Sequence, residues 1–97
     1  MSWRRTKEYR RWRILVIRRD KVCQLCGSKK HRNAHHMNCG SYHPEDRFDV
    51  DNGVTLCGSC HSNYHNNYHR SYRTKCTKYD YKNFLSLFKY IRSLTIV

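Results

Sequence analysis

The sequence predicts a small α+β domain in which bound metal supplies stability that the hydrophobic core cannot supply alone. The chain has 97 residues, which suffices for one small domain. Its aliphatic residues gather near residues 14–17 and 84–97, whereas the middle is rich in His, Cys, Asn and Tyr and contains two C-x-x-C pairs. We therefore expect a single domain over residues 1–97, with a core at about 20–70 between an N-terminal and a C-terminal helix.

The strong positive charge of the chain indicates a polyanionic partner. Twenty Lys and Arg residues against seven Asp and Glu give a formal net charge of +13. Residues 1–21 carry nine of the basic side chains, and the tail after His61 carries seven more. This localised pattern favours nucleic acid over a basic surface that serves solubility or ribosomal packing.

Targeting signals and membrane segments are not expected. The first apolar run, residues 14–17, is short and is bracketed by arginines, unlike a signal peptide or a bilayer span. We expect a cytoplasmic protein without membrane contact, whose six cysteines stay reduced.

Residues 6–19 are predicted to form a basic N-terminal helix. This stretch contains no Gly or Pro, Thr6 is a suitable N-cap, and four apolar side chains recur at helical spacing: Tyr9, Trp12, Leu15 and Val16. A helix docked on the core with a solvated basic face is the simpler interpretation, and a helix that reads DNA bases is the alternative.

The second half of the chain contains three further predicted elements. "GVTLC" at residues 53–57 is typical of a short strand, and a helix can start at Gly58 and carry His61 and His65. A final helix is expected at about 80–95, docked on the core or, less simply, forming a dimer contact. Its apolar face comprises Phe84, Leu85, Phe88, Ile91 and Leu94.

The two C-x-x-C pairs predict a structural zinc site. Cys23, Cys26, Cys57 and Cys60 provide four thiolates, which close a tetrahedral coordination sphere and leave no position for water. Redox-active thiols are the alternative, but the chain lacks the βαβ pattern that accompanies them. Cys39 and Cys76 fall outside this framework.

The histidines suggest a second site with catalytic potential. Neighbouring residues of a strand point to opposite faces, so His35 and His36 have different surroundings. His61 and His65 share one helix face and, with His35, can hold a divalent ion, which leaves His36 as a general base beside a metal-bound phosphate. A second structural zinc, or scattered surface histidines, are the alternatives.

Several ordered motifs resemble the HNH nucleases, which have a ββα-metal core. The motifs are "AHHM" at 34–37, "DNGVTLC" at 51–57 and "CHSNYH" at 60–65, enclosed by the C-x-x-C pairs. The preceding "WRILVIRRDKVCQLCG" is similar to the stretch that leads into this core in phage and homing-type members. The resemblance covers roughly residues 9–69.

The resemblance implies a ββα-metal (His-Me finger) fold and an activity. It assigns His35 and His61 as ligands of a catalytic divalent metal (Mg²⁺, Mn²⁺, Ni²⁺ or Zn²⁺) and His36 as the general base. Asn52 braces the loop that positions the base, and either His65 or Asn52 completes the metal sphere. The reaction is hydrolysis of DNA to 5′-phosphate and 3′-hydroxyl ends, as in a phage-encoded homing or nicking enzyme acting in the host cell. The alternative is a non-catalytic zinc-ribbon protein that binds nucleic acid.

The acidic stretch "YHPEDRFDVDNG" is interpreted as turn and capping structure. Its carboxylates cluster with Pro44 and Gly53, which are residues typical of turns. Arg47 in this stretch could contact a phosphate, although an exposed arginine is the simpler interpretation.

Overall fold

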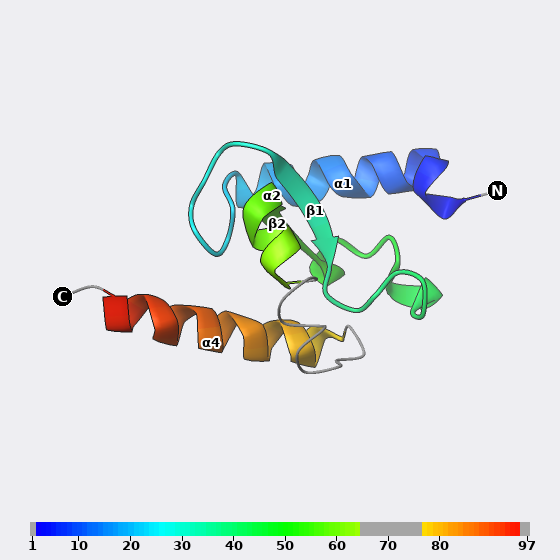
Figure 1. Cartoon of the computed structure of the whole chain (residues 1–97). Coiled ribbons are helices and arrows are strands. Elements are labelled where there is room, and N and C mark those ends of the chain that lie inside the picture. The colour runs from blue at the N-terminus through cyan, green and yellow to red at the C-terminus, as the bar shows by residue number, and fades with distance from the viewer. Residues whose placement is uncertain (1, 65–76, 96–97) are drawn as a thin grey trace.

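The computed structural model describes residues 2–64 and 77–95, with side chains to residue 90, and shows a small α+β arrangement (Figure 1). A two-stranded antiparallel sheet lies between α1 on one side and α2 and α4 on the other. The α+β class expected from the sequence is confirmed. The elements, in chain order, are η1 (Trp3–Arg5), α1 (Lys7–Asp20), β1 (Arg32–His36), η2 (Pro44–Asp46), η3 (Val50–Asn52), β2 (Gly53–Cys57), α2 (Gly58–Ser62) and α4 (Lys78–Thr95).

Helix α1 spans Lys7–Asp20, one residue later at each end than the predicted helix. Thr6 is its N-cap, as predicted, and its Oγ1 accepts a hydrogen bond from the Tyr9 N–H at 3.2 Å. Trp12 and Val16 are buried against the sheet, whereas Leu15 is 39% exposed, so its predicted place on the buried face was wrong. Leu15 is exposed because a sheet of only two strands, about 5 Å apart, is too narrow to cover more than one row of large side chains on the helix.

The strands β1 and β2 pair so that each presents two different faces. His36 lies opposite Gly53 and His35 opposite Val54. Gly53 faces α1 closely, since a Cβ atom there would collide with Val16 and lie 2.9 Å from Trp12 Cζ2. Every residue of β2 is buried, and the predicted strand at 53–57 is confirmed.

The larger core lies on the face of the sheet away from α1. Val54 and Leu56 of β2 pack there with Tyr64, and α4 adds Tyr81 and Phe84. Leu85 and Phe88 are half-buried against this cluster, whereas the predicted apolar positions Ile91 and Leu94 lie outside the described side chains. The predicted C-terminal helix thus docks on the core through its first turns.

Two sets of hydrogen bonds hold the first turn of α4. Thr77 and Asp80 exchange hydrogen bonds, with Asp80 N–H donating to Thr77 Oγ1 and Thr77 N–H donating to Asp80 Oδ2. The Lys78 N–H donates to Asn38 Oδ1 at 2.7 Å, which ties the helix start to the loop after β1. Among the described residues, no helix is long and apolar enough to cross a membrane.

Candidate functional site

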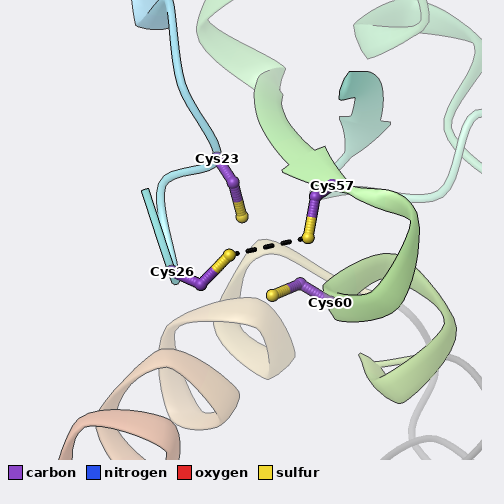
Figure 2. A group of neighbouring side chains, drawn as sticks. All are labelled: Cys23, Cys26, Cys57 and Cys60. Atoms are coloured by element: carbon purple, nitrogen blue, oxygen red, sulfur yellow. Dashed lines mark hydrogen bonds between the residues drawn. The ribbon is translucent and has the colours of Figure 1, made fainter. Parts of the chain in front are cut away.

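The four cysteines of the two C-x-x-C pairs converge on one point (Figure 2). Cys23 and Cys26 lie on the turn after α1, Cys57 ends β2, and Cys60 lies on α2. Their Sγ atoms all lie within 4.8 Å of one another, and those of Cys26 and Cys57 are 3.6 Å apart. One metal ion can therefore contact all four sulfur atoms, and this donor set is the one that tetrahedral zinc sites use.

The four thiols differ in how easily they lose a proton. Without a cation between them, their surroundings oppose the ionisation of several of them at once. Burial opposes ionisation of Cys23, but hydrogen bonds from backbone N–H groups, including that of Cys26, lower its pKa to about 7. Burial, and then the neighbouring thiols Cys57, Cys26 and Cys23, raise the pKa of Cys60. A bound divalent cation would offset the repulsion between neighbouring thiolates.

Strand β1 sends its two adjacent histidines to opposite sides of the sheet, as the alternation of a strand requires. The His35 ring contacts Tyr64, with ring centroids 4.9 Å apart, on the side of α2 and α4. The His36 ring stacks on Trp12 of α1, with centroids 3.9 Å apart and an interplanar angle of 8°. The two histidines therefore have separate surroundings, as expected.

His35 and His61 come together between β1 and α2. Their ring centroids are 5.2 Å apart, His35 is 3% exposed, and His61 is half-buried. Burial lowers the pKa of His61, which favours the neutral imidazole that binds metal. The predicted third ligand, His65, lies outside the described residues.

His36 is held by a backbone carbonyl as well as by stacking. Its Nε2 lies 2.8 Å from the carbonyl oxygen of Arg47. A carbonyl oxygen only accepts, so Nε2 carries the proton and Nδ1 carries the lone pair. Burial, with a smaller effect from the positive charges of Arg4 and Arg47, lowers the pKa of His36, although the carbonyl hydrogen bond opposes this shift.

Asn52 braces the loop between the two strands. The residue is 1% exposed, and its Oδ1 accepts a hydrogen bond from the Asn38 N–H at 2.8 Å. Its Nδ2 donates to the carbonyl oxygens of Asn38 and Asp46, at 3.0 and 3.2 Å. Asp46 adjoins Arg47, whose carbonyl contacts His36, so the Asn52 amide holds the segment that orients His36.

A pocket of about 190 Å³ connects these groups. His35, His36 and His61 all line it, together with Arg4, Cys39 and Gly40. The imidazole and guanidinium groups that line it are polar groups of the kind that orient a ligand in a concave site. The structure thus brings three of the predicted site histidines to one pocket, whereas Asn52 does not line it.

Sequence reasoning missed the aromatic wall around His36. Trp3 meets the His36 ring edge-on at 5.3 Å, and Tyr9 stacks parallel to it at 6.3 Å. The sequence predicts Tyr9 and Trp12 only as apolar side chains at helical spacing, and it gives no indication of a role for Trp3. Their spacing in α1 predicted burial, but no local signal shows which strand residue they contact.

The acidic stretch after β1 has the turn and capping structure expected. Asp49 caps η3, since its side chain accepts a hydrogen bond from the Asp51 N–H at 2.9 Å. The side chains of His43, Glu45 and Asp46 also gather, with ligand atoms within 4.8 Å of one another. The Asp46 carboxylate already accepts a hydrogen bond from Asn38 Nδ2 at 3.1 Å.

No protein-family model, curated protein or solved structure matches this chain.

Proposed function

We propose that this chain is an HNH-type, metal-dependent endonuclease with a ββα-metal core, which hydrolyses DNA phosphodiesters to 5′-phosphate and 3′-hydroxyl ends. One observation carries the proposal. A single pocket is lined by a pair of histidines suited to a metal ion and by a third histidine held for proton transfer. That division of roles among imidazoles is what one-metal hydrolysis of a phosphodiester needs.

His35 and His61 would hold the divalent ion, which is Mg²⁺, Mn²⁺, Ni²⁺ or Zn²⁺ in this proposal. His65 is the third ligand that we favour, because both amide atoms of Asn52 already bind backbone groups. Bound there, the ion would supply positive charge to stabilise the reacting phosphate and the leaving oxygen. A ligand set of imidazoles favours softer ions over Mg²⁺.

His36 would act as the general base. Its Nε2–H is committed to the Arg47 carbonyl, which leaves Nδ1 to accept a proton from a water molecule in the pocket. Stacking on Trp12 fixes the plane of the ring. Asn52 supports this role from a distance, since it braces the loop that carries the carbonyl.

The cysteine cluster would hold a structural zinc ion. Four sulfur ligands leave no open position for substrate, so this site contributes to folding and not to hydrolysis. DNA is the proposed substrate because the net charge of +13 favours a polyanion.

The test is relaxation of supercoiled plasmid DNA with Mg²⁺, Mn²⁺ or Ni²⁺. The wild-type chain should nick or linearise the plasmid, and His36→Ala should lower the rate by about 10²-fold or more, as expected for loss of a general base. His43→Ala is the matched control, because His43 does not line the pocket and its Nδ1 lies 3.6 Å from the Glu45 carboxylate.

Two results would count against the proposal. A wild-type chain that binds DNA but cuts it with none of these metals would instead favour a zinc-ribbon protein that only binds nucleic acid. Equal rates for the wild type and His36→Ala would show that His36 is not the base.

A further inference from the structure

We infer that Arg4 and Arg47, held over the ring of Trp3, form a binding site for a backbone phosphate of DNA beside the histidine pocket. The identity of the ligand as DNA rests on the proposed function. The site itself follows from how three side chains, from η1 and from the turn after η2, lie relative to one another.

The two guanidinium groups share one aromatic ring. Arg4 Cζ lies 4.2 Å from the centroid of the Trp3 ring, and Arg47 Cζ lies 4.6 Å from the same ring. Arg4 also lines the pocket that contains the three histidines. Trp3 in turn meets the His36 ring edge-on, so both positive charges lie next to the proposed general base.

The local structure fixes these side chains in advance. Trp3 fits closely over Gly40, because a Cβ atom at Gly40 would lie 2.6 Å from Trp3 Cη2. The Gly40 carbonyl accepts a hydrogen bond from Arg47 Nε at 2.9 Å, which orients the guanidinium and leaves its terminal nitrogens as donors. Thr6 Oγ1 donates to the Trp3 carbonyl at 2.7 Å and holds η1 in place.

Carboxylates of the described residues do not pair with the charges at this site. Within residues 2–64 and 77–90, neither Arg4 nor Arg47 forms an ion pair with a carboxylate, unlike Arg19, which pairs with Asp20. The two guanidinium groups lie 4.2 and 4.6 Å from one ring centroid, so their positive charges repel each other, and a bound anion would offset that repulsion. Arg4 is exposed and Arg47 half-buried, so a ligand can reach both.

A phosphate diester is the anion that this geometry suits. The planar fork of a guanidinium matches two phosphate oxygens. Stacking on an aromatic ring already restricts the arginine side chain, so it loses less conformational entropy when a phosphate binds. A phosphate bound here would place the adjoining stretch of the strand at the histidine pocket. The N-terminal turn η1, which lies outside the sequence motifs, thus becomes part of the substrate site.

The test measures binding of a fluorescently labelled DNA duplex to the full chain by anisotropy, without added divalent metal. Arg4→Gln should weaken binding about tenfold, as expected for loss of one charge-assisted contact, and lower the slope of log K against log salt by about 1. Arg5→Gln is the matched control, since it removes an exposed charge of the same turn. It should change the affinity by less than about threefold.

A second variant shows whether the two arginines contact one phosphate. The loss for Arg4→Gln with Arg47→Gln together should be smaller than the sum of the single losses, because groups that share a ligand are not additive. Arg4→Lys should restore part of the affinity, since it keeps the charge without the fork. Equal melting temperatures of the Arg4 and Arg5 variants show that both are folded.

The results separate this inference from the proposed function. Equal losses for Arg4→Gln and Arg5→Gln would overturn the phosphate site, even if the chain cuts DNA. Selective loss for Arg4→Gln in a chain that cuts no DNA would support the phosphate site and contradict the nuclease.

Discussion

At the scale of single residues, the site depends on a few polar side chains with several partners each. Asn52 makes three hydrogen bonds to backbone groups while almost fully buried. Its amide offers one acceptor and two donors in a fixed plane, which matches the loop's one free N–H and two carbonyls. No other side chain of this size has that pattern of donors and acceptors, so no other residue can make all three hydrogen bonds at this position.

Replacement of Asn52 should therefore destabilise the fold as well as the site. Asn52→Ala leaves the Asn38 N–H and two carbonyls without their partner, and we expect a loss of about 3 kcal/mol in the free energy of unfolding. Asn33→Ala is the control, because the Asn33 side chain makes one hydrogen bond, to the His31 carbonyl at 3.2 Å. Urea denaturation measures both. A loss no larger for Asn52→Ala than for Asn33→Ala would show that the loop does not depend on this amide.

The roles of these residues were accessible from the sequence to different degrees. The opposite directions of His35 and His36 follow from strand alternation alone, and the cysteine cluster follows from the spacing of the pairs. The stacking of Trp12 on His36 does not, because it joins α1 to β1 through tertiary packing that no local pattern encodes. The prediction of an exposed Arg47 was wrong, because Arg47 is half-buried over the ring of Trp3, a residue of a distant segment.

At the scale of elements, α1 fastens the sheet and the loop to each other. Trp12 stacks on His36 and donates its Nε1–H to the Asp49 carbonyl at 2.7 Å. Arg19 donates to the carbonyls of Val50 and Gly53, at 2.8 and 2.6 Å. Helix α1 is therefore a structural part of the candidate site, beyond the predicted role of a basic helix docked on the core.

The carboxylate of Asp20, the last residue of α1, accepts a hydrogen bond from the Thr55 N–H of the sheet. Because this carboxylate titrates, the free energy of unfolding depends on pH. Burial raises the pKa of Asp20, but hydrogen bonds from Arg19 and from the Thr55 N–H outweigh it and leave the pKa below its usual value. The folded state thus binds the proton less tightly than the unfolded state. Its stabilisation is complete above about pH 4 and is lost as the pH falls through the folded pKa.

We expect Asp20→Asn to lower the free energy of unfolding by about 1–3 kcal/mol at pH 7, as for a charge-assisted hydrogen bond. The difference from the wild type should shrink as the pH falls below about 4, where the unfolded state gains its proton first, and should be lost below the lower pKa of the folded state. Asp51→Asn, which removes an exposed carboxylate, should show a smaller difference at pH 7. Denaturation curves across pH 2–7 measure this, and a difference that stays constant with pH would contradict the assigned pKa shift.

At the scale of the whole molecule, the proposed zinc site is part of the hydrophobic core. Cys23, Cys57 and Cys60 belong to the same buried cluster as Leu56 and Phe84. That cluster joins the turn after α1, the end of β2, α2 and α4. His61 lies on α2, and the ring of His35, on β1, lies near that of Tyr81 of α4. Metal at the cysteines would therefore determine whether the histidine pocket forms.

Loss of the metal should unfold the domain and abolish the pocket with it. Structural zinc contributes about 10–16 kcal/mol of apparent binding free energy, which matches or exceeds the 5–15 kcal/mol typical of domain stability. We expect Cys57→Ser to contain about one zinc ion fewer per chain than Cys39→Ser, whose thiol lies outside the cluster. Cys57→Ser should also lose its cooperative melting transition and most of its near-UV circular dichroism, whereas Cys39→Ser should keep both. A folded Cys57→Ser chain with unchanged zinc content would show that hydrophobic packing alone maintains this fold, and that the cysteines do not hold the ion.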